Sequence, residues 1–440
     1  MKFKASRLAL IEAIDKQSGE DVINEVIKSG VDINARDSNG VPALVVAIKK
    51  WDLCSFRKLL ANGADANISD FRGNTPLSLC CSCRDSEFIK LLIKYGANVD
   101  GSKHPKSVPP LIQAVQSDSR IAKFLLRNRA NPNVFNPTTG DSPLHLAICK
   151  KDLDLIEVLI RCGANVAAQS NIGRTPLHAS IYPLESLEIA KTLVKNTLMN
   201  GLDINLVDSK GQTALHLACY SGSNAMISLL IDNGADINAK NIYSQTPAEL
   251  ALLYPTRRIN ADMEHLKKSF IGHMIALHSA GMYLRASNLD ICNRFIREGK
   301  VRRAKKQSWT RYLNDCKQEV MDLKKDIIPT TAEKSWFDVL TSEDTAHLSY
   351  SVKEMDRTVI NRFPIYGPML KIKLYTDLAK ARYESARKQI YRYLDWIAAK
   401  QGMILPQEIV IKIVSYLSNE DLRMFFREIR LSNDLSNDLL

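Results

Sequence analysis

The segment Asp208–Asn238, DSKGQTALHLACYSGSNAMISLLIDNGADIN, carries a pattern that recurs upstream and constrains what most of this chain can fold into. Its first residues are typical of a turn, and Thr213 is placed to cap a short helix whose apolar residues share one face. A second helix is predicted over Met226–Ile231, and Gly234 stands where helices commonly end in left-handed backbone. The unit therefore predicts a turn followed by two short helices.

The same sequence pattern recurs in other units of the chain at a period of roughly 33 residues. Units open at Gly73–Leu77, Asp141–Ala147 and Gly173–His178, and units close at Lys28–Asn34, Asn62–Asp65, Tyr95–Asn98 and Cys162–Asn165. In these residues the chain closely resembles the ankyrin-repeat family over residues 1–285. The resemblance implies an all-α fold, an ankyrin-repeat solenoid of helix pairs with β-turn hairpins. About seven repeats and an atypical eighth that caps the stack are expected.

Some units depart from the pattern. Val41–Leu44 and Val108–Leu111 keep the proline but lose the threonine cap, and Arg129 replaces the usual glycine, so these units are expected to be looser. The sixth unit has extra residues between Lys195 and Gly201. The eighth is interrupted over Tyr254–Lys268 before an expected helix at residues 271–277.

Composition places the chain among ordinary globular proteins. Its 440 residues are 45% hydrophobic, which is enough for two or three structural units. The start, Met1–Arg7, is too charged for a signal peptide, and no apolar run approaches membrane-spanning length. Nine cysteines scattered through a long chain indicate reduced thiols. We therefore expect a soluble, non-secreted protein without a membrane partner.

Two side-chain sets invite a metal or catalytic interpretation. Cys80, Cys81 and Cys83 lie close together, but Cys80 falls on the packed face of a first helix and no second matching pair supplies four zinc ligands. A second set, formed by the histidines at one repeat position, comprises His145, His178 and His216. No nucleophile or carboxylate recurs with them, and in the ankyrin family this histidine is a structural hydrogen-bonding residue. Packing cysteines and structural histidines are the favoured interpretations, and no cofactor, metal site or enzyme activity is expected.

After residue 285 the repeat stops and residues 286–400 are predicted to form a helical connector. This stretch contains 23 lysines and arginines against 15 acidic residues, a net +8 that accounts for most of the chain's +12. Helices are expected at Leu289–Ala304, Trp309–Lys325, Ser349–Asn361 and Leu370–Ala399. The basic run Lys300–Lys306 is typical of a solvated helical face, with a nuclear-import signal or a nucleic-acid patch as alternatives. Tyr391–Trp396 similarly favours helix packing over base stacking.

The last segment, residues 401–440, predicts two short helices with apolar residues on one face of each. Its sequence resembles the F-box, whose family docks on the Skp-type adaptor of cullin-based ubiquitin ligases. The matching positions, which the resemblance assigns to adaptor binding, are Leu405, Pro406, Glu408, Ile409, Ile413, Leu417 and Leu422. The cysteine and tryptophan that usually follow in a third helix are absent, so this is a short C-terminal F-box-like helical domain.

Ankyrin repeats followed by a shortened F-box resemble the layout of poxvirus ankyrin proteins, whose tail is called the PRANC domain. The resemblance implies a substrate-recruiting adaptor that modulates host antiviral defence or host range. The repeats would hold a host protein, and the tail would recruit the Skp-type adaptor and cullin of a host SCF ubiquitin ligase. Its location is expected to be the host cytoplasm, with nuclear entry left open.

Three other functions compete with the adaptor. The first alternative is a stoichiometric inhibitor that sequesters a host signalling protein on its repeats without ubiquitination. Nucleic-acid binding fits the pI near 9.1, but the sequence has no motif that recognises bases. An enzyme is the least favoured class, because no nucleophile, base and orienting group can be proposed together from the sequence. The surface for a host target is predicted on turn tips and inner helices, with these candidates: Asn39, Phe71, Arg72, Asn171, Arg174, Ser209, Lys210 and Tyr243.

Overall fold

The structure, a computed structural model, describes residues 8–70, 73–83, 85–181, 187–200, 202–253, 263–280, 284–298, 303–325 and 335. Within these residues the chain is helical, and isolated antiparallel bridges join Arg36 to Pro42 and Val207 to Thr213 inside two of the hairpins. The expected all-α repeat fold is thereby confirmed. The chain divides into two compact units, Met1–Ile172 and Gly173–Leu440.

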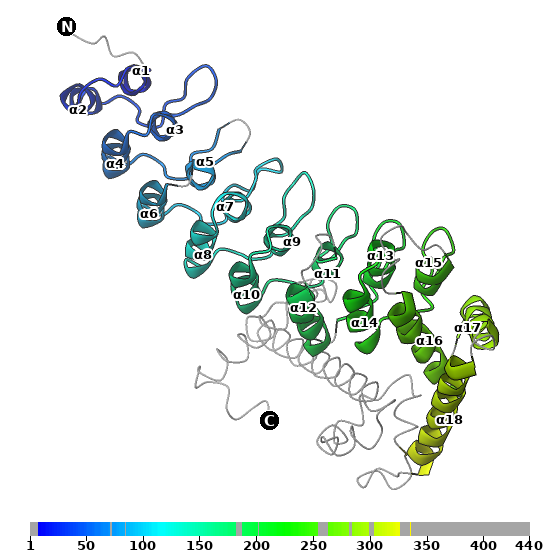
Figure 1. The fold of residues 1–440 in the computed structure, drawn as a ribbon. Coiled ribbons are helices and arrows are strands. Elements are labelled where there is room, and N and C mark those ends of the chain that lie inside the picture. The colour runs from blue at the N-terminus through cyan, green and yellow to red at the C-terminus, as the bar shows by residue number, and fades with distance from the viewer. Residues whose placement is uncertain are drawn as a thin grey trace, which may run out of the picture. The chain divides into compact units, whose positions relative to one another are not determined.

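The described part of the first unit is a row of helix pairs (Figure 1). The first helix of each pair is α1 (Ala9–Asp15), α3 (Ala43–Lys49), α5 (Pro76–Cys83), α7 (Pro110–Ser117) or α9 (Pro143–Cys149). The second helix is α2 (Glu20–Lys28), α4 (Leu53–Ala61), α6 (Ser86–Lys94), α8 (Ser119–Arg127) or α10 (Leu153–Arg161). Each first helix packs against the first helix of the next pair, so the core is a continuous apolar layer that runs along the row.

The second unit continues the same pattern in its own right. Its first helices are α11 (Pro176–Ala179), α13 (Ala214–Ser221), α15 (Pro247–Leu253) and α17 (Ala286–Glu298). Its second helices are α12 (Leu187–Met199), α14 (Asn224–Asp232), α16 (Met263–Ser279) and α18 (Arg303–Lys325). The first helices α11, α13, α15 and α17 pack in sequence, and so do the second helices α12, α14, α16 and α18. No helix of the described residues is both long and apolar enough to cross a membrane.

Side-chain caps explain where the second helices begin. In α4, α6, α8 and α10 the residue before the helix is an aspartate whose carboxylate accepts a backbone N–H of the first turn. Such a cap satisfies one of the free donors at a helix start and stabilises the helix by about 1 kcal/mol. By contrast, Pro42 and Pro109 precede α3 and α7 without any side-chain cap, as the departures in the sequence predicted.

Within each of the two units, a side-chain oxygen near the end of one repeat accepts a backbone N–H from the next repeat. In the first unit the backbone N–H of Asp65 donates to Asn34 Oδ1 at 2.9 Å, and that of Asn98 donates to Asn67 Oδ1 at 2.6 Å. The same bond recurs from Asn131 to Asp100 at 2.8 Å and from Asn165 to Asn133 at 2.7 Å. In the second unit Asp236 donates to Asn205 at 2.7 Å, and Arg285 to Asn238 at 3.0 Å. We call these bonds the inter-repeat ladder.

The irregular units differ from the sequence-based expectations in detail. The extra residues of the sixth unit lengthen α12 to 13 residues, where the second helices of the first unit have nine. The helix expected over residues 271–277 is longer than predicted, because α16 begins at Met263 inside the expected interruption. Likewise the helix expected over Leu289–Ala304 is wrong as a single element: α17 ends at Glu298, and Ala304 belongs to α18. The helices expected at Ser349–Asn361 and Leu370–Ala399 lie outside the described residues.

A buried polar network joins α17 to the eighth repeat. The Asn288 side chain, fully buried, donates to the carbonyl of Ile237 at 2.9 Å and accepts from the Thr246 hydroxyl at 2.9 Å. The backbone N–H of Arg285 completes the last step of the inter-repeat ladder. Since buried polar groups are tolerated only when they are hydrogen-bonded, this network specifies one position for α17 on the stack. Two helices of the expected connector, α17 and α18, therefore pack on the repeats.

The backbone at Arg129 generates a prediction about stability. Arg129 is exposed and has φ +66, where the sister positions Gly63, Gly96 and Gly163 have φ between +80 and +87. Left-handed backbone costs a residue with a Cβ atom about 1–2 kcal/mol, and a glycine avoids this cost. Part of the resulting gain in stability is lost, because glycine gives the unfolded chain more conformational freedom. Arg129→Gly should therefore raise the free energy of unfolding by about 0.5–1 kcal/mol in urea denaturation.

Its matched control is Asn128→Gly, because Asn128 precedes it with φ −92 and donates from its side chain to the Phe124 carbonyl. That variant should be destabilised. A loss of stability in Arg129→Gly would show that the arginine side chain makes a contact worth more than the backbone strain.

Candidate functional site

The hairpin tips present the most freely variable side chains of this fold. At three of the tips an Asp or Asn side chain bends the backbone by accepting N–H groups from residues two and four positions later. Asp37 Oδ1 accepts from Asn39 at 2.9 Å, Asp208 Oδ1 from Lys210 at 2.8 Å, and Asn241 Oδ1 from Tyr243 at 2.9 Å. Because these bonds satisfy the backbone N–H groups of the turn, the side chains between them are not needed for packing and are available for a partner.

In the second unit two neighbouring tips are fastened to each other. The backbone N–H of Ile242 donates to the carbonyl of Lys210 at 3.1 Å. Gly211, with φ +66, lies so close to the next tip that an added Cβ atom would be 3.2 Å from the Ile242 nitrogen. The tips at residues 208–211 and 241–244 therefore form one continuous surface, which we call the paired tips.

The repeat histidines hold these tips in position. The His178 Nε2 lies 2.9 Å from the carbonyl of Gln212, and the His216 Nε2 lies 3.0 Å from that of Gln245. Their Nδ1 atoms accept from the backbone N–H and the hydroxyl of Thr175 and Thr213, respectively, so the neutral imidazole with a proton on Nε2 fits both ends. Gln212 and Gln245 directly follow the paired tips, and the structural interpretation of these histidines is confirmed. His145 makes the same cap with Ser142 in the first unit.

The paired tips bring together three of the predicted target-binding residues. Ser209 and Lys210 are exposed on the first tip, and Tyr243 is 65% exposed on the second. Arg174 has a different environment: its guanidinium Nε lies 3.9 Å from the carboxylate of Asp208, a residue that is itself buried. Arg174 therefore helps to hold the first of the paired tips, and only part of its side chain faces solvent.

The remaining predicted target residues belong to the first unit. Asn39 is exposed at the first tip of the chain. Asn171 is exposed and donates to the preceding tip, from its backbone N–H to the Thr139 carbonyl at 3.0 Å and from its side chain to the Thr138 carbonyl at 3.0 Å. Phe71 and Arg72 lie outside the described residues.

Sequence reasoning missed several apolar residues on these surfaces. Ile242 is 62% exposed beside Tyr243, and Val207 is 45% exposed at the start of the preceding tip. In the first unit the tip residue Ile172 and the loop residue Phe135 are also about half exposed. The register of the turn motif holds the missing signal, since Ile172 and Ile242 occupy positions between the turn-forming Asp or Asn and the following Gly or Ser. An exposed aromatic or aliphatic residue there is typical of an interface.

The first helices contribute less surface than expected. Residues 43–48 of α3 and residues 214–219 of α13 are buried throughout, and only their last residues reach solvent. These helices are short and pack against a neighbour on either side, so few of their side chains remain for a partner. In the described part of the chain the candidate surface is therefore formed mainly by the tips.

Two of the three clustered cysteines are packing residues. Cys80 and Cys81 are buried in α5, and burial raises the pKa of the Cys81 thiol to about 12. Such thiols stay protonated at neutral pH and are poor metal ligands. Cys83 is exposed at the end of the same helix. Among the described residues, no group of three or more His, Cys, Asp or Glu side chains is arranged to hold a metal ion.

All the predicted adaptor-binding residues lie outside the described residues: Leu405, Pro406, Glu408, Ile409, Ile413, Leu417 and Leu422. The basic run Lys300–Lys306 is only partly described, with Arg303 to Lys306 in the first turn of α18.

Comparison with known families identifies two kinds of module in the chain. Profiles of ankyrin repeats match residues 8–103, 44–136, 111–208 and 198–251. A profile of the PRANC domain matches residues 332–427, which covers part of the expected connector and most of the F-box-like segment.

Individual proteins are similar to part of this chain. An ankyrin repeat protein of Rickettsia bellii (strain RML369-C) is 32% identical over 136 residues, which are 31% of this chain and 73% of that protein. An ankyrin repeat protein of fowlpox virus (strain NVSL), FPV222, is 28% identical over 140 residues, 31% of this chain and 18% of that protein. The solved ankyrin repeat domain of Bcl-3, of the IkappaB family, shares 23% identity at a TM-score of 0.43, covering 51% of this chain and 97% of that domain. The chain spans 10–21% of the length of the first three curated relatives.

The histidine that holds the second of the paired tips predicts a pH dependence of stability. Burial lowers the pKa of His216 below its ordinary value, because the charged imidazolium is poorly solvated there, and the hydrogen bond to the Gln245 carbonyl offsets only part of this effect. The unfolded chain then binds a proton that the folded chain excludes, so this stabilisation is present above about pH 6.5 and is lost as the pH falls through the pKa of the folded state. Urea unfolding between pH 7.5 and pH 5 should show a smaller loss of stability in His216→Gln than in the unmodified chain. Equal losses of stability in His216→Gln and in the unmodified chain would contradict this role of His216. The control is His278→Gln, a change at an exposed histidine.

Proposed function

This chain belongs to the ankyrin-repeat proteins that carry a PRANC domain, the combination found in poxvirus proteins, and we propose that it recruits a host protein to a host SCF ubiquitin ligase. In this proposal the hairpin tips hold the target, and the F-box-like residues inside the PRANC match contact the Skp-type adaptor and, through it, the cullin. The observation that carries the proposal is the presence of both modules on one chain, with an exposed partly apolar tip surface on the repeats.

The chemistry of such an adaptor is proximity. Joining two binding surfaces on one body converts the meeting of target and ligase into an intramolecular event, which raises the effective concentration of target lysines near the ligase. Both modules are non-catalytic protein-interaction modules, and we propose that the chain itself performs no covalent step. Ubiquitin transfer in host cells would place the protein in the cytoplasm, with nuclear entry as an alternative.

The paired tips support the target-binding half of the proposal. Ile242 and Tyr243 offer two neighbouring apolar side chains, and Lys210 and Ser209 add a charge and a hydroxyl beside them. Apolar anchors surrounded by polar groups are typical of protein interfaces, and their rigid backbone lowers the entropy lost on binding. This surface alone would also suffice for the alternative function, a stoichiometric inhibitor that sequesters a host signalling protein.

Removing the apolar anchors should impair target capture. In affinity purification from transfected cells, the double variant Ile242→Ala, Tyr243→Ala should retain the captured host protein at least about tenfold less well than the unmodified chain. The matched control is Tyr220→Ala, because Tyr220 is 60% exposed near the end of α13 in the same unit, away from the tips. If both variants retain the same host protein as strongly as the unmodified chain, the target surface lies elsewhere.

Disrupting the F-box-like motif should separate the two candidate functions. Burial of each apolar side chain is worth about 1.5–3 kcal/mol, so Leu405→Ala with Ile409→Ala should weaken adaptor binding more than about tenfold. Lys412→Ala with Ser415→Ala is the control, since these residues are not among the motif positions. Co-purification of the adaptor and cullin is the measurement, with an ordinary F-box protein as the positive reference. If the unmodified chain retains its host target but neither ligase component, the sequestering inhibitor is the correct function.

A further inference from the structure

The fourth repeat differs from its neighbours in charge. Residues 101–133 hold six lysines and arginines against one carboxylate. The repeat before them, residues 70–100, holds four of each kind, and the repeat after them, residues 134–167, holds three lysines and arginines against four carboxylates. The excess of positive charge is therefore confined to one repeat of this row.

Four of the six cations have no carboxylate partner among the described residues. The Arg120 guanidinium lies 2.8 Å from the Asp118 carboxylate, and the Lys123 ammonium lies 3.7 Å from that of Asp154. The exposed cations that make no ion pair with a described residue are Lys103, Lys106, Arg127 and Arg129.

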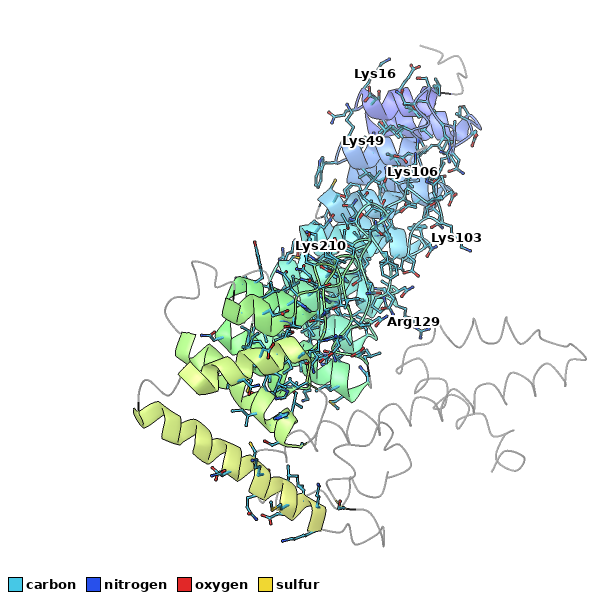
Figure 2. All side chains as sticks on the ribbon, turned by 90° about the vertical axis from the view of Figure 1, so that its right-hand side faces the viewer. Lys16, Lys49, Lys103, Lys106, Arg129 and Lys210 are labelled. Carbon is cyan, nitrogen blue, oxygen red and sulfur yellow. The ribbon has the colours of Figure 1, made fainter. Side chains whose placement is uncertain are left out.

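The inter-repeat ladder brings three of these cations together. The Asp100 carboxylate accepts the backbone N–H of Asn131 at 2.8 Å. The loop that leads to Lys103 therefore lies beside the residues that follow α8, among them Arg129. Figure 2 shows Lys103 and Arg129 on the same edge of the stack.

The same edge continues into the fifth repeat. Asn133 Oδ1 accepts the backbone N–H of Asn165 at 2.7 Å, and its side-chain amide donates to the Gly163 carbonyl at 2.9 Å. The ends of α6, α8 and α10 and the loops after them thus form one connected surface. We call residues 94–103, 127–133 and 161–167 the loop edge.

The loop edge stays positive when every carboxylate on it is counted at full charge. Asp100 keeps its charge while it accepts a backbone N–H, and Glu157 lies one helical turn before Arg161 on α10. Against these two carboxylates stand five exposed cations, so the net charge is +3: Lys94, Lys103, Arg127, Arg129 and Arg161. Asp65, on the corresponding loop of the second repeat, would still leave the sum positive.

The remaining carboxylates of residues 70–167 lie elsewhere in the repeats. They are on hairpins or at the N-terminal ends of the second helices: Asp70, Asp85, Glu87, Asp118, Asp141, Asp152 and Asp154. The polarity of the second helices explains this separation, since caps and acidic residues favour the N-terminal end and cations the C-terminal end.

Arg129 is the cation that helix stability does not explain. Lys94, Arg127 and Arg161 are the last residues of their helices, where a positive charge complements the helix dipole. Arg129 lies beyond its helix, in left-handed backbone that is unfavourable for a residue with a Cβ atom. The corresponding residues after α2, α4, α6, α10 and α14 are all glycines with positive φ: Gly30, Gly63, Gly96, Gly163 and Gly234.

The Arg129 side chain also has no packing function at this position. At the sister residues Gly30, Gly63 and Gly96 an added Cβ atom would meet nothing within 4 Å, so a side chain there projects into open space. An arginine in strained backbone without a contact to stabilise it is an observation from which a functional hypothesis can start.

The two carboxylates of the loop edge favour one class of anion over another. In a nucleic acid every phosphate is charged, so a strand along the edge would set phosphates against Asp100 and Glu157. A protein segment can place uncharged residues at these two points and its own carboxylates opposite the cations, which gives electrostatic complementarity.

We propose that the loop edge is a second protein-binding surface, which takes an acidic segment of a partner protein whose carboxylates are separated by uncharged residues. Lys103, Arg127 and Arg129 pair with those carboxylates. The surface uses residues of the first unit alone, whereas the paired tips belong to the second unit, so it goes beyond the proposed function.

The test uses the full chain and defined probes. A fluorescein-labelled 12-residue peptide with Glu at every third position and Ser or Gly between is titrated by fluorescence polarisation, beside the same peptide with Lys in place of Glu and a labelled 12-nucleotide oligothymidylate. We expect the acidic peptide to bind, with an affinity that falls as KCl is raised, and the lysine peptide not to bind. Arg129→Gly should weaken the acidic peptide about threefold to fivefold, as the loss of one exposed ion pair does, and Arg127→Gln with Arg129→Gly at least about tenfold.

Two controls separate binding from folding and from general attraction. Arg129→Gly should bind the peptide less well although it unfolds at a higher urea concentration, so the lost affinity cannot come from unfolding. Arg120→Gln removes the same charge from the other end of α8, where Arg120 faces Asp118, and should leave the affinity unchanged. Target capture through the paired tips should persist in all these variants, so a failure here leaves the proposed function intact.

Four outcomes would overturn the proposal. The acidic peptide fails to bind at concentrations up to about 1 mM, or it binds Arg129→Gly as tightly as the unmodified chain. Arg120→Gln weakens it as much as Arg129→Gly does, which would indicate attraction by net charge alone. The oligothymidylate binds more tightly than the acidic peptide and loses affinity in Arg129→Gly, which would assign the loop edge to nucleic acid.

Discussion

The hydrogen bond between successive repeats is the interaction on which the rest of this structure depends. A pair of helices of seven to nine residues cannot bury enough apolar surface to be stable alone, so each repeat needs its neighbours. The inter-repeat ladder sets how those neighbours meet, because a side-chain oxygen of one repeat accepts a backbone N–H of the next at 2.6–3.0 Å. A fixed register at this point aligns the apolar faces of the helices and brings each hairpin tip beside the next.

The ladder also explains why the described stack continues beyond the last recognisable repeat. At Arg285 the acceptor is still Asn238, although no hairpin signature follows in the sequence. Asn288 then uses the polar groups of the eighth repeat and is completely buried in doing so. The profile match of the PRANC domain begins at residue 332, seven residues after α18 ends. The helices before that domain thus belong structurally to the repeats.

Polar bonds that hold the tips in place also leave their outer side chains without a structural task. Asp208 illustrates this division: its carboxylate shapes one tip and faces Arg174, whereas the adjacent Ser209 and Lys210 are exposed. The histidines extend the same arrangement, because one ring both caps its own helix and holds the tip of the next repeat. A scaffold with this property can change its partner through tip residues without losing its fold, which suits a protein that binds other proteins.

The sequence by itself determined the repeat, its helix pairs, the missing caps before α3 and α7, and the structural role of His145, His178 and His216. These features are local: a turn, a cap and a helical face depend on residues within a few positions of one another. The local sequence is therefore enough to predict them. Only the tertiary structure decided that Arg174 is half engaged with Asp208, that Ile242 joins Tyr243 on an exposed tip, and that α17 packs as a further repeat. It alone placed Trp51 on Phe88, which lies in the next repeat. Each of these depends on contacts between residues about 30 or more positions apart or on solvent exposure, and the period of a sequence fixes neither.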